Sequence, residues 1–253
     1  MLKEMESWAR EVGQLQMDSF QKNIKIESKD RKIDLVTEID NKSEEILVDK
    51  IISAYPDHSI MAEEGRNKRN DSRYRWIIDP LDGTVNYVHG FPIFAISLAL
   101  YKDNQPEYGL VYLPYFDDFY SASRGQGSYY NGERIHVNKD YAVKDGIIAT
   151  GFPYSHQDSN KSLNLFTKIL PEAGGIRRTG AAAYDLCQVA RGIFSGFWEI
   201  ELKLWDIAAG ILLVEEAGGV ITDFEGNKLR IKSEQVVAGS KAVNNQLREL
   251  LNK

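Results

Sequence analysis

Apolar residues recur every three or four positions in six parts of the chain, which is the spacing of a helix that buries one face. The first run contains Met5, Trp8, Val12 and Leu15, and a longer run starts at Ile39. Two glycines follow the fifth run directly, as is common where a helix ends. The predicted helices cover residues 5–15, 39–54, 163–170, 182–190, 205–217 and 241–251.

Other segments contain short runs of β-branched and aromatic residues between turn residues, which predicts strands. Asn131-Gly132 joins two such runs and is typical of a tight hairpin turn. A strand that includes Trp76 is expected to stop at Pro80, because proline cannot donate to a sheet ladder. The charged segment 27–32 predicts a loop. The predicted strands cover residues 76–78, 94–101, 109–112, 119–123, 147–150, 197–200, 220–223 and 236–239.

The order of these elements indicates an α+β fold. Antiparallel strands dominate the middle of the chain, and strands alternate with helices from Ile147 onward. No repeat and no low-complexity linker separates the two parts. We therefore expect a single domain over residues 1–253, built from two tightly packed lobes of about residues 1–143 and 144–253.

Composition narrows the functional classes. The chain has 253 residues with a net charge of 31 − 37 = −6, which argues against direct nucleic-acid binding. Cys187 is the only cysteine, so neither an internal disulfide nor a cysteine-based zinc site can form, and we expect it in the core. The N-terminus lacks an apolar run of signal-peptide length, and the longest apolar stretch, 91–100, is too short to cross a bilayer. We expect a soluble, cytoplasmic protein without membrane association.

Residues 79–84 carry two carboxylates, three positions apart, at the end of a predicted strand. Pro80 bends the chain between them, so both can converge on one hard cation. Mg²⁺ is the expected cation, because it prefers oxygen ligands and keeps waters for chemistry. Gly83 allows close backbone approach, and the N–H groups of Gly83 and Thr84 would face phosphate at a helix start. The alternative is an Asp-rich turn with an Asp helix cap.

Three further carboxylates have ordinary explanations when each is taken alone. Glu63 and its neighbour Glu64 would suit an exposed loop. Asp206 precedes an apolar helix, where a carboxylate favours the positive end of the helix dipole. Asp40 lies three residues after Thr37, which is the spacing of a capping box. It is their combination with residues 79–84 that indicates a metal site.

These segments resemble, in the right order, the signatures of the inositol monophosphatase family. Residues 76–87 (WIIDPLDGTVNY) are similar to the first signature and residues 205–219 (WDIAAGILLVEEAGG) to the second. Smaller blocks match at residues 34–40 and 62–64. The resemblance spans nearly the whole chain, with no departure at a metal-ligand position. It implies a layered αβαβα sandwich of the inositol monophosphatase and fructose-1,6-bisphosphatase type.

The resemblance also implies two Mg²⁺ ions in one active site, with a weaker third. Glu63, Asp79 and the backbone carbonyl of Leu81 would hold the first ion. Asp79, Asp82 and Asp206 would hold the second, and Glu63 would assist the third. The first lobe would thus bind metal and the second would bind substrate.

The resemblance to the inositol monophosphatase family implies catalytic roles for three residues. Thr84, oriented by Asp40, would position the attacking water, and Glu63 would act beside them. Phosphoryl transfer needs mainly an in-line water and neutralised charge, so no covalent intermediate is required. The resemblance further implies inhibition by lithium and assembly into a homodimer.

Substrate recognition is predicted from residues of both lobes. Glu199 matches a family position that accepts hydrogen bonds from substrate hydroxyls, although a solvated strand residue is the alternative. Arg177 and Arg178 could attract an anionic substrate, yet paired arginines are more often surface residues. The substrate-binding residues implied by the resemblance are Asp82, Gly83, Thr84, Gly180, Ala181, Ala182, Glu199 and Ser155.

The leading interpretation is Mg²⁺-dependent hydrolysis of a small phosphate monoester, first of all inositol monophosphate. Fructose 1,6-bisphosphate, NADP(H) and adenosine 3′,5′-bisphosphate are alternative substrates within the same superfamily. A binding protein is the alternative from another class, since some bacterial relatives act as partners of the transcription machinery. The intact set of carboxylates favours the enzyme.

Overall fold

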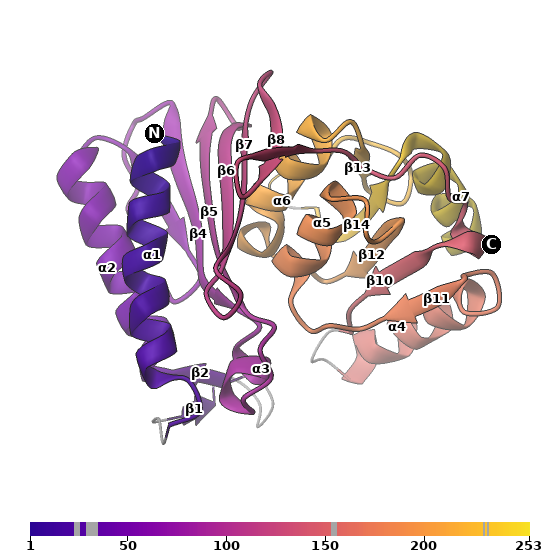
Figure 1. Cartoon of the computed structure of the whole chain (residues 1–253), viewed down its shortest axis with the longest axis horizontal. Coiled ribbons are helices and arrows are strands. Elements are labelled where there is room, and N and C mark those ends of the chain that lie inside the picture. Colours follow the sequence, from indigo (N-terminus) through magenta and orange to yellow (C-terminus); the bar gives the residue numbers. More distant parts are fainter. Residues whose placement is uncertain (23–25, 29–34, 153–155, 230, 232) are drawn as a thin grey trace.

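The computed structural model describes residues 1–22, 26–28, 35–152, 156–229, 231 and 233–253. Two large sheets stand side by side, and helices cover and separate them in five layers (Figure 1). This arrangement confirms the expected αβαβα sandwich. The helices of the three helical layers are, in order across the molecule, α1 (Leu2–Ser19) and α2 (Glu38–Ala54), then α5 (Ala182–Ala190) and α6 (Leu204–Glu216), then α4 (His156–Ile169) and α7 (Lys241–Leu251).

The first sheet has seven strands, which follow one another in space as they do along the chain. Its first two strands are parallel and all later neighbours are antiparallel. Asn131 and Gly132 form its last turn with φ angles of 48° and 84°, as predicted for a hairpin of this sequence. The strands are β3 (Ser59–Ala62), β4 (Tyr74–Asp82), β5 (Ala95–Lys102), β6 (Gln105–Leu113), β7 (Asp118–Ser123), β8 (Gly127–Tyr130) and β9 (Glu133–Ile135).

The second sheet has five strands in the order β11-β10-β12-β14-β13, and its neighbours β10 and β12, and β12 and β14, are not consecutive along the chain. The first three are parallel, and the last two run antiparallel to their neighbours. The lobe boundary predicted near residue 143 lies between the last strand of the first sheet and the first strand of the second. The strands are β10 (Ile147–Thr150), β11 (Gly175–Arg177), β12 (Gly196–Ile200), β13 (Val220–Thr222) and β14 (Gln235–Gly239).

Four short elements complete the described chain: β1 (Ile26–Ser28) pairs antiparallel with β2 (Leu35–Thr37), α3 (Thr84–Val88) follows β4, and a 3₁₀ turn covers Val143–Asp145. Residues 27 and 28 were expected in a loop and lie in a strand instead. Their local sequence is polar, so the strand is defined by its pairing with β2 and not by an apolar pattern. Residues 29–32 of the same segment lie outside the described residues.

The core is divided by the two sheets. One cluster packs α1 and α2 against the outer face of the first sheet, and another packs α7 on the second. The largest cluster lies between the sheets around α5 and α6, and it contains Cys187, which is fully buried as expected. Among the described helices, none combines the length and the apolarity that a membrane span needs.

Close approach between α6 and the first sheet depends on a glycine. A Cβ atom added to Gly109 of β6 would lie 3.0 Å from the carbonyl oxygen of Ala209 and 3.2 Å from its Cα. Backbone atoms of a central helix cannot move aside as a flexible side chain can. Gly109 therefore fixes the distance at which α6, and with it Asp206, stands from the sheet.

The Gly109→Val substitution tests this packing. Valine suits a strand, but here its side chain must displace the α6 backbone, and such overpacking costs about 1–3 kcal/mol. We expect the free energy of unfolding, measured with urea, to fall by that amount. The matched control is Gly175→Val in β11, where the new Cβ would meet only the Arg177 guanidinium at 3.6 Å. Equal stability of the two variants would contradict the account.

Candidate active site

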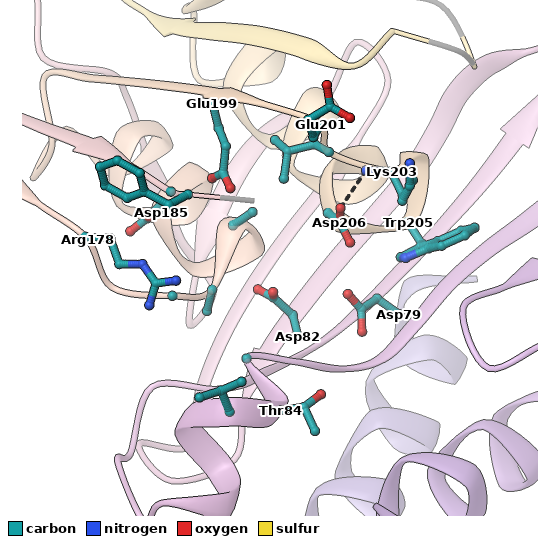
Figure 2. Close-up of a pocket in the computed structure, with 18 of the residues that line it drawn as sticks. Asp79, Asp82, Thr84, Arg178, Asp185, Glu199, Glu201, Lys203, Trp205 and Asp206 are labelled. Atoms are coloured by element: carbon teal, nitrogen blue, oxygen red, sulfur yellow. Dashed lines mark hydrogen bonds between the residues drawn. The ribbon is translucent and has the colours of Figure 1, made fainter. Parts of the chain in front are cut away.

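A cleft of about 390 Å³ lies between the two sheets. Its walls are the carboxyl ends of β3, β4 and β12 and the first turns of α5 and α6. Among the described residues that line it, seven are Asp or Glu and two are Lys or Arg. Figure 2 shows the side chains of Asp79, Asp82 and Asp206 directed into the same space. Asp79, Asp82 and Asp185 are buried and the other four acidic residues are half-buried, and such an excess of carboxylates favours the binding of cations.

The segment from Asp79 to Asp82 belongs to the sheet, contrary to the expected end at Pro80. Strand β4 continues to Asp82, and its register against β5 shifts between Asp79 and Asp82. The irregularity accommodates the proline, which cannot donate to the ladder. Leu81 N–H donates to Asp79 Oδ1 at 3.1 Å, and Gln16 Nε2 donates to the Pro80 carbonyl at 2.8 Å. The bulge thereby places both carboxylates on the cleft, as the sequence predicted.

Gly83 and Thr84 follow the bulge as the first residues of a short helix. Gly83 has φ 88°, and a Cβ atom there would lie 2.9 Å from the Ile93 carbonyl, so only glycine fits. The Thr84 hydroxyl lies 2.9 Å from Asp40 Oδ1 and 3.1 Å from the Leu81 carbonyl. Thr84 lines the cleft, whereas Asp40 is fully buried behind it.

Asp40 performs both of the roles that the sequence suggested. Its Oδ2 accepts from the Thr37 backbone N–H at 2.9 Å and completes a capping box at the start of α2. Its Oδ1 accepts from Thr84. Burial raises the pKa of Asp40, and the hydrogen bonds from Thr37 and Thr84 oppose that rise. The helix cap thus holds the carboxylate at a fixed distance from the threonine hydroxyl.

Glu63 lies one residue beyond β3, and its backbone N–H donates to the Ile78 carbonyl at 3.2 Å. Glu44 of α2 holds the turn that carries Glu63. The two oxygens of Glu44 accept from the backbone N–H groups of Glu64 at 2.6 Å and Arg66 at 2.8 Å. Glu44 is fully buried, so it fixes the path of the turn and with it the position of Glu63.

Asp206 occupies the third position of α6 and also lines the cleft. Its Oδ2 accepts from the Lys203 backbone N–H at 2.6 Å, which caps the helix as the alternative interpretation suggested. Figure 2 shows the Asp206 carboxylate above Asp79, with the Trp205 ring beside them. Capping and a place in the cleft are therefore compatible in one carboxylate.

Asp82 connects the two halves of the site. Its Oδ2 accepts from the backbone N–H of Ala183 at 2.8 Å, so a carboxylate of the first sheet caps α5. Gly180, Ala181 and Ala182, which precede that contact, line the cleft as predicted. The cleft side of α5 is therefore positioned directly by one of the expected metal ligands.

Charge repulsion among the carboxylates contributes to raised pKa values. Burial, followed by the charges of Glu63, Asp82 and Asp206, raises the pKa of Asp79 well above its ordinary value. Burial raises the pKa of Asp82 to about 7, against the hydrogen bond from Ala183. A hard divalent cation among these oxygens would relieve both effects. The donor set thus fits Mg²⁺.

The described residues do not already enclose an ion. No three or more of their His, Cys, Asp and Glu side chains form a group gathered closely enough to hold a metal. Asp79 and Glu63 lie within hydrogen-bonding reach of each other. Shared ions would require the side chains of Glu63, Asp79, Asp82 and Asp206 to reorient.

The predicted substrate residues fall into three groups. Glu199 lies on β12 and lines the cleft. Arg178 also lines it, while Arg177 is exposed and its guanidinium donates to the Ile176 carbonyl. Ser155 lies outside the described residues.

Sequence reasoning missed four polar residues that support or line the site. Gln16, Glu44 and Asp185 are at most 1% exposed, and Asn86 is 9% exposed. A detectable signal existed for the first two, because each interrupts the apolar face of an amphipathic helix. A polar residue at a core position is hydrogen-bonded in nearly every structure and therefore indicates a partner. The partner itself cannot be read from the helix.

The fold and the cleft define a class: a layered α/β protein with a carboxylate-rich site between two sheets. The model of the inositol monophosphatase family matches residues 1–253. The chain therefore belongs to the inositol monophosphatase family.

Individual relatives and a solved structure agree with that assignment. The fructose-1,6-bisphosphatase/inositol-1-monophosphatase of Aquifex aeolicus is 44% identical over 95% of this chain and 91% of its own length. The Nus factor SuhB of Pseudomonas aeruginosa is 40% identical over 92% of this chain and 88% of its own. The crystal structure of the extragenic suppressor protein suhB from Bartonella henselae superimposes with a TM-score of 0.95 at 36% identity, covering 100% of this chain and 98% of that one.

The raised acidities predict how Mg²⁺ and pH act together on stability. The pKa of Asp82 is about 7 in the folded protein, so without metal the folded state keeps a proton that the unfolded chain releases near pH 4. Stability of the metal-free protein must then fall as pH rises through the interval from about 4 to 7. Mg²⁺ binds the ionised carboxylates, so it should raise the melting temperature far more at pH 8 than at pH 5.

Thermal unfolding in excess chelator and in excess Mg²⁺, at both pH values, measures this effect. Na⁺ at equal ionic strength is the control, because it screens charge without demanding the same coordination. A Mg²⁺ effect that is the same at pH 5 and pH 8, or is matched by Na⁺, would contradict the arrangement described.

Proposed function

We propose that this protein is a Mg²⁺-dependent phosphomonoesterase that hydrolyses the phosphate ester of a small polyol, with inositol monophosphate as the leading substrate. One observation carries the proposal: carboxylates from three separate parts of the chain, Glu63, Asp79 with Asp82, and Asp206, line one cleft. A hydroxyl backed by a buried carboxylate stands at the same cleft. The family membership and the names of the relatives support the same activity.

Each expected ligand has a place in this proposal. Glu63, Asp79 and the Leu81 carbonyl would hold one Mg²⁺, and Asp79, Asp82 and Asp206 would hold a second. Glu63 would assist a weaker third ion. When bound, Mg²⁺ supplies neutralisation of phosphate charge and lowers the pKa of water.

Thr84 and Asp40 prepare the water that attacks phosphorus. The Thr84 hydroxyl donates to Asp40 Oδ1, which leaves the lone pairs of Thr84 to accept a hydrogen bond from the water. That bond aligns the water oxygen with phosphorus and gives its proton a path toward Thr84 and Asp40. The new P–O bond forms as the ester P–O bond breaks, and the alcohol leaves protonated by solvent.

The alcohol half of the substrate would contact the second lobe. Gly180, Ala181 and Ala182 offer a wall without bulky side chains, and Glu199 offers a hydroxyl acceptor. The N–H groups of Gly83 and Thr84 would face the phosphate. The homodimer that the resemblance implies and the cytoplasmic location that the composition predicts stay predictions.

A phosphate-release assay over a panel of substrates tests the proposal. The panel contains inositol 1-phosphate, fructose 1,6-bisphosphate, NADP(H), adenosine 3′,5′-bisphosphate and 4-nitrophenyl phosphate. Chelation should abolish release, Mg²⁺ should restore it, and Ca²⁺ should restore it poorly because its coordination is larger and looser. Li⁺ is close in size to Mg²⁺ with one charge fewer, so millimolar Li⁺ should inhibit. Full turnover in excess chelator would overturn the metal mechanism.

Two substitutions separate metal binding from water alignment. Asp79→Asn should be the most damaging single change, because that carboxylate is proposed to bridge two ions. Thr84→Ala should lower kcat about a hundredfold or more with little change in KM, because the hydroxyl acts on the water in the transition state. Thr84→Ser keeps the hydroxyl and should recover most of the rate. A rise in KM alone for Thr84→Ala would contradict its role.

A second candidate function is a non-enzymatic role as a partner of the transcription machinery. The Pseudomonas relative named Nus factor SuhB favours it. Retention of the parent protein and of Asp79→Asn on purified RNA polymerase would test it. Equal retention of both, together with no phosphate release from any substrate of the panel, would favour this role over the enzyme.

A further inference from the structure

A second carboxylate stands beside Glu199 and has no part in the expected metal site. Asp185 lies on the first turn of α5, is 1% exposed and still lines the cleft. Figure 2 shows Asp185, Glu199 and Arg178 together at one end of the cleft, away from Asp79 and Asp206. This end is where the alcohol half of a substrate would lie if its phosphate sits among the metal ligands.

The closeness of Asp185 and Glu199 affects their pKa values. Burial, followed by the charge of Asp185, raises the pKa of Glu199 well above its ordinary value. Burial also raises the pKa of Asp185 well above its ordinary value. Asp185 is buried and Glu199 is half-buried, and two acids so close together destabilise the fold unless a partner offsets their desolvation. Groups in that condition inside a cleft are characteristic of functional sites.

The structural role of Asp185 does not need its charge. The Thr179 hydroxyl donates to Asp185 Oδ1 at 2.7 Å, and an asparagine carbonyl could accept the same bond. The loop is also held without Asp185, because Asn86 Nδ2 donates to the Thr179 carbonyl at 2.9 Å and to the Ile93 carbonyl at 2.7 Å. An ionisable acid at this position therefore has a reason beyond bracing the loop.

Arg178 supplies the local positive charge. It is exposed at the cleft, and its charge favours the ionised forms of both Asp185 and Glu199 against the effect of burial. A carboxyl group keeps an acceptor oxygen whether or not it is ionised, and the ionised form that Arg178 favours only accepts. The chemistry complementary to such a pair is a set of hydroxyl donors on neighbouring carbons, as in a polyol.

We propose that Asp185 is a specificity-determining residue that accepts a hydrogen bond from one substrate hydroxyl while Glu199 accepts from another. The inference rests on the proposed function and narrows it: the alcohol is a polyol that presents two hydroxyls on the side away from its phosphate. A simple aryl or alkyl phosphate lacks those donors. It would lose both bonds and keep only the contacts of its phosphate.

The test compares kcat/KM for inositol 1-phosphate and for 4-nitrophenyl phosphate in the parent, Asp185→Asn and Glu199→Gln. Each substitution weakens one charge-assisted acceptor, so the ratio of the two constants should fall about tenfold to a hundredfold in each variant. Singly deoxygenated inositol phosphates then locate the bonds. With a substrate that lacks the hydroxyl bound by Asp185, Asp185→Asn should have no further effect. With a substrate that lacks a different hydroxyl, Glu199→Gln should have none, as in a double-mutant cycle.

Thr179→Val is the matched control, because it removes the brace and keeps the Asp185 carboxylate. It should change both substrates by the same factor and leave the ratio intact. If Asp185→Asn also left the ratio intact, or if Thr179→Val lowered it equally, the residue would be a brace and the proposal would be overturned.

Two further outcomes lead to conclusions other than a bracing role for Asp185. If Asp185→Asn does not fold, the test uses the parent protein alone. Removal of either of two different hydroxyls from the substrate must then lower kcat/KM. A loss for only one of the two deoxygenated substrates overturns the inference. Absence of phosphate release by the parent from every compound of the panel would overturn the proposed function itself. The proposal for Asp185 and the proposed phosphatase function can therefore fail independently, and each failure gives a different result.

Discussion

Repulsion among buried carboxylates is the constraint on which the rest of the site depends. Glu63, Asp79, Asp82 and Asp206 line one small cleft, and burial with mutual repulsion raises the pKa of Asp79. A folded chain tolerates such an arrangement only where the surrounding structure imposes it. Cations would relieve it, so the same feature that costs stability supports the proposal that the cleft binds Mg²⁺.

The surrounding structure imposes the arrangement through backbone contacts that are far apart in sequence. Gln16 of α1 holds the bulge at Pro80, and Glu44 of α2 holds the turn after Glu63. Asp82 caps α5, so the first sheet and the central helices meet at a carboxylate of the cleft itself. In the proposed function, an ion bound at Asp82 would therefore be linked directly to the position of residues 180–183.

Most elements could be predicted from the sequence, because periodicity is a local property. Helices 182–190 and 241–251 match α5 and α7, and the acidic residues expected to bind metal, which signatures in the right order indicated, line one cleft. The continuation of β4 through Pro80 could not, since it depends on Gln16, which lies 64 positions away. The strand over residues 26–28 likewise depends on pairing with β2 and not on its own composition.

The site illustrates the same limit. Asp40 and Asp206 were ambiguous between helix capping and function, and the structure gives each a cap and a place at the site in one geometry. Asp185 carried no signal at all, because a single acid on an apolar helix has no partner until the fold supplies Glu199. Long-range neighbours, and not residue types, decide which acid belongs to the cleft.

Direct counting of bound ions tests the central claim most closely. Mn²⁺ occupies the same oxygen sites as Mg²⁺ and loses its free-ion electron paramagnetic resonance signal on binding, so titration of the metal-free protein counts ions at equilibrium. The account predicts at least two ions for the parent, displaced by Mg²⁺, and a loss of that binding in Asp79→Asn. Binding that is absent in the parent, or unchanged in Asp79→Asn, would contradict it.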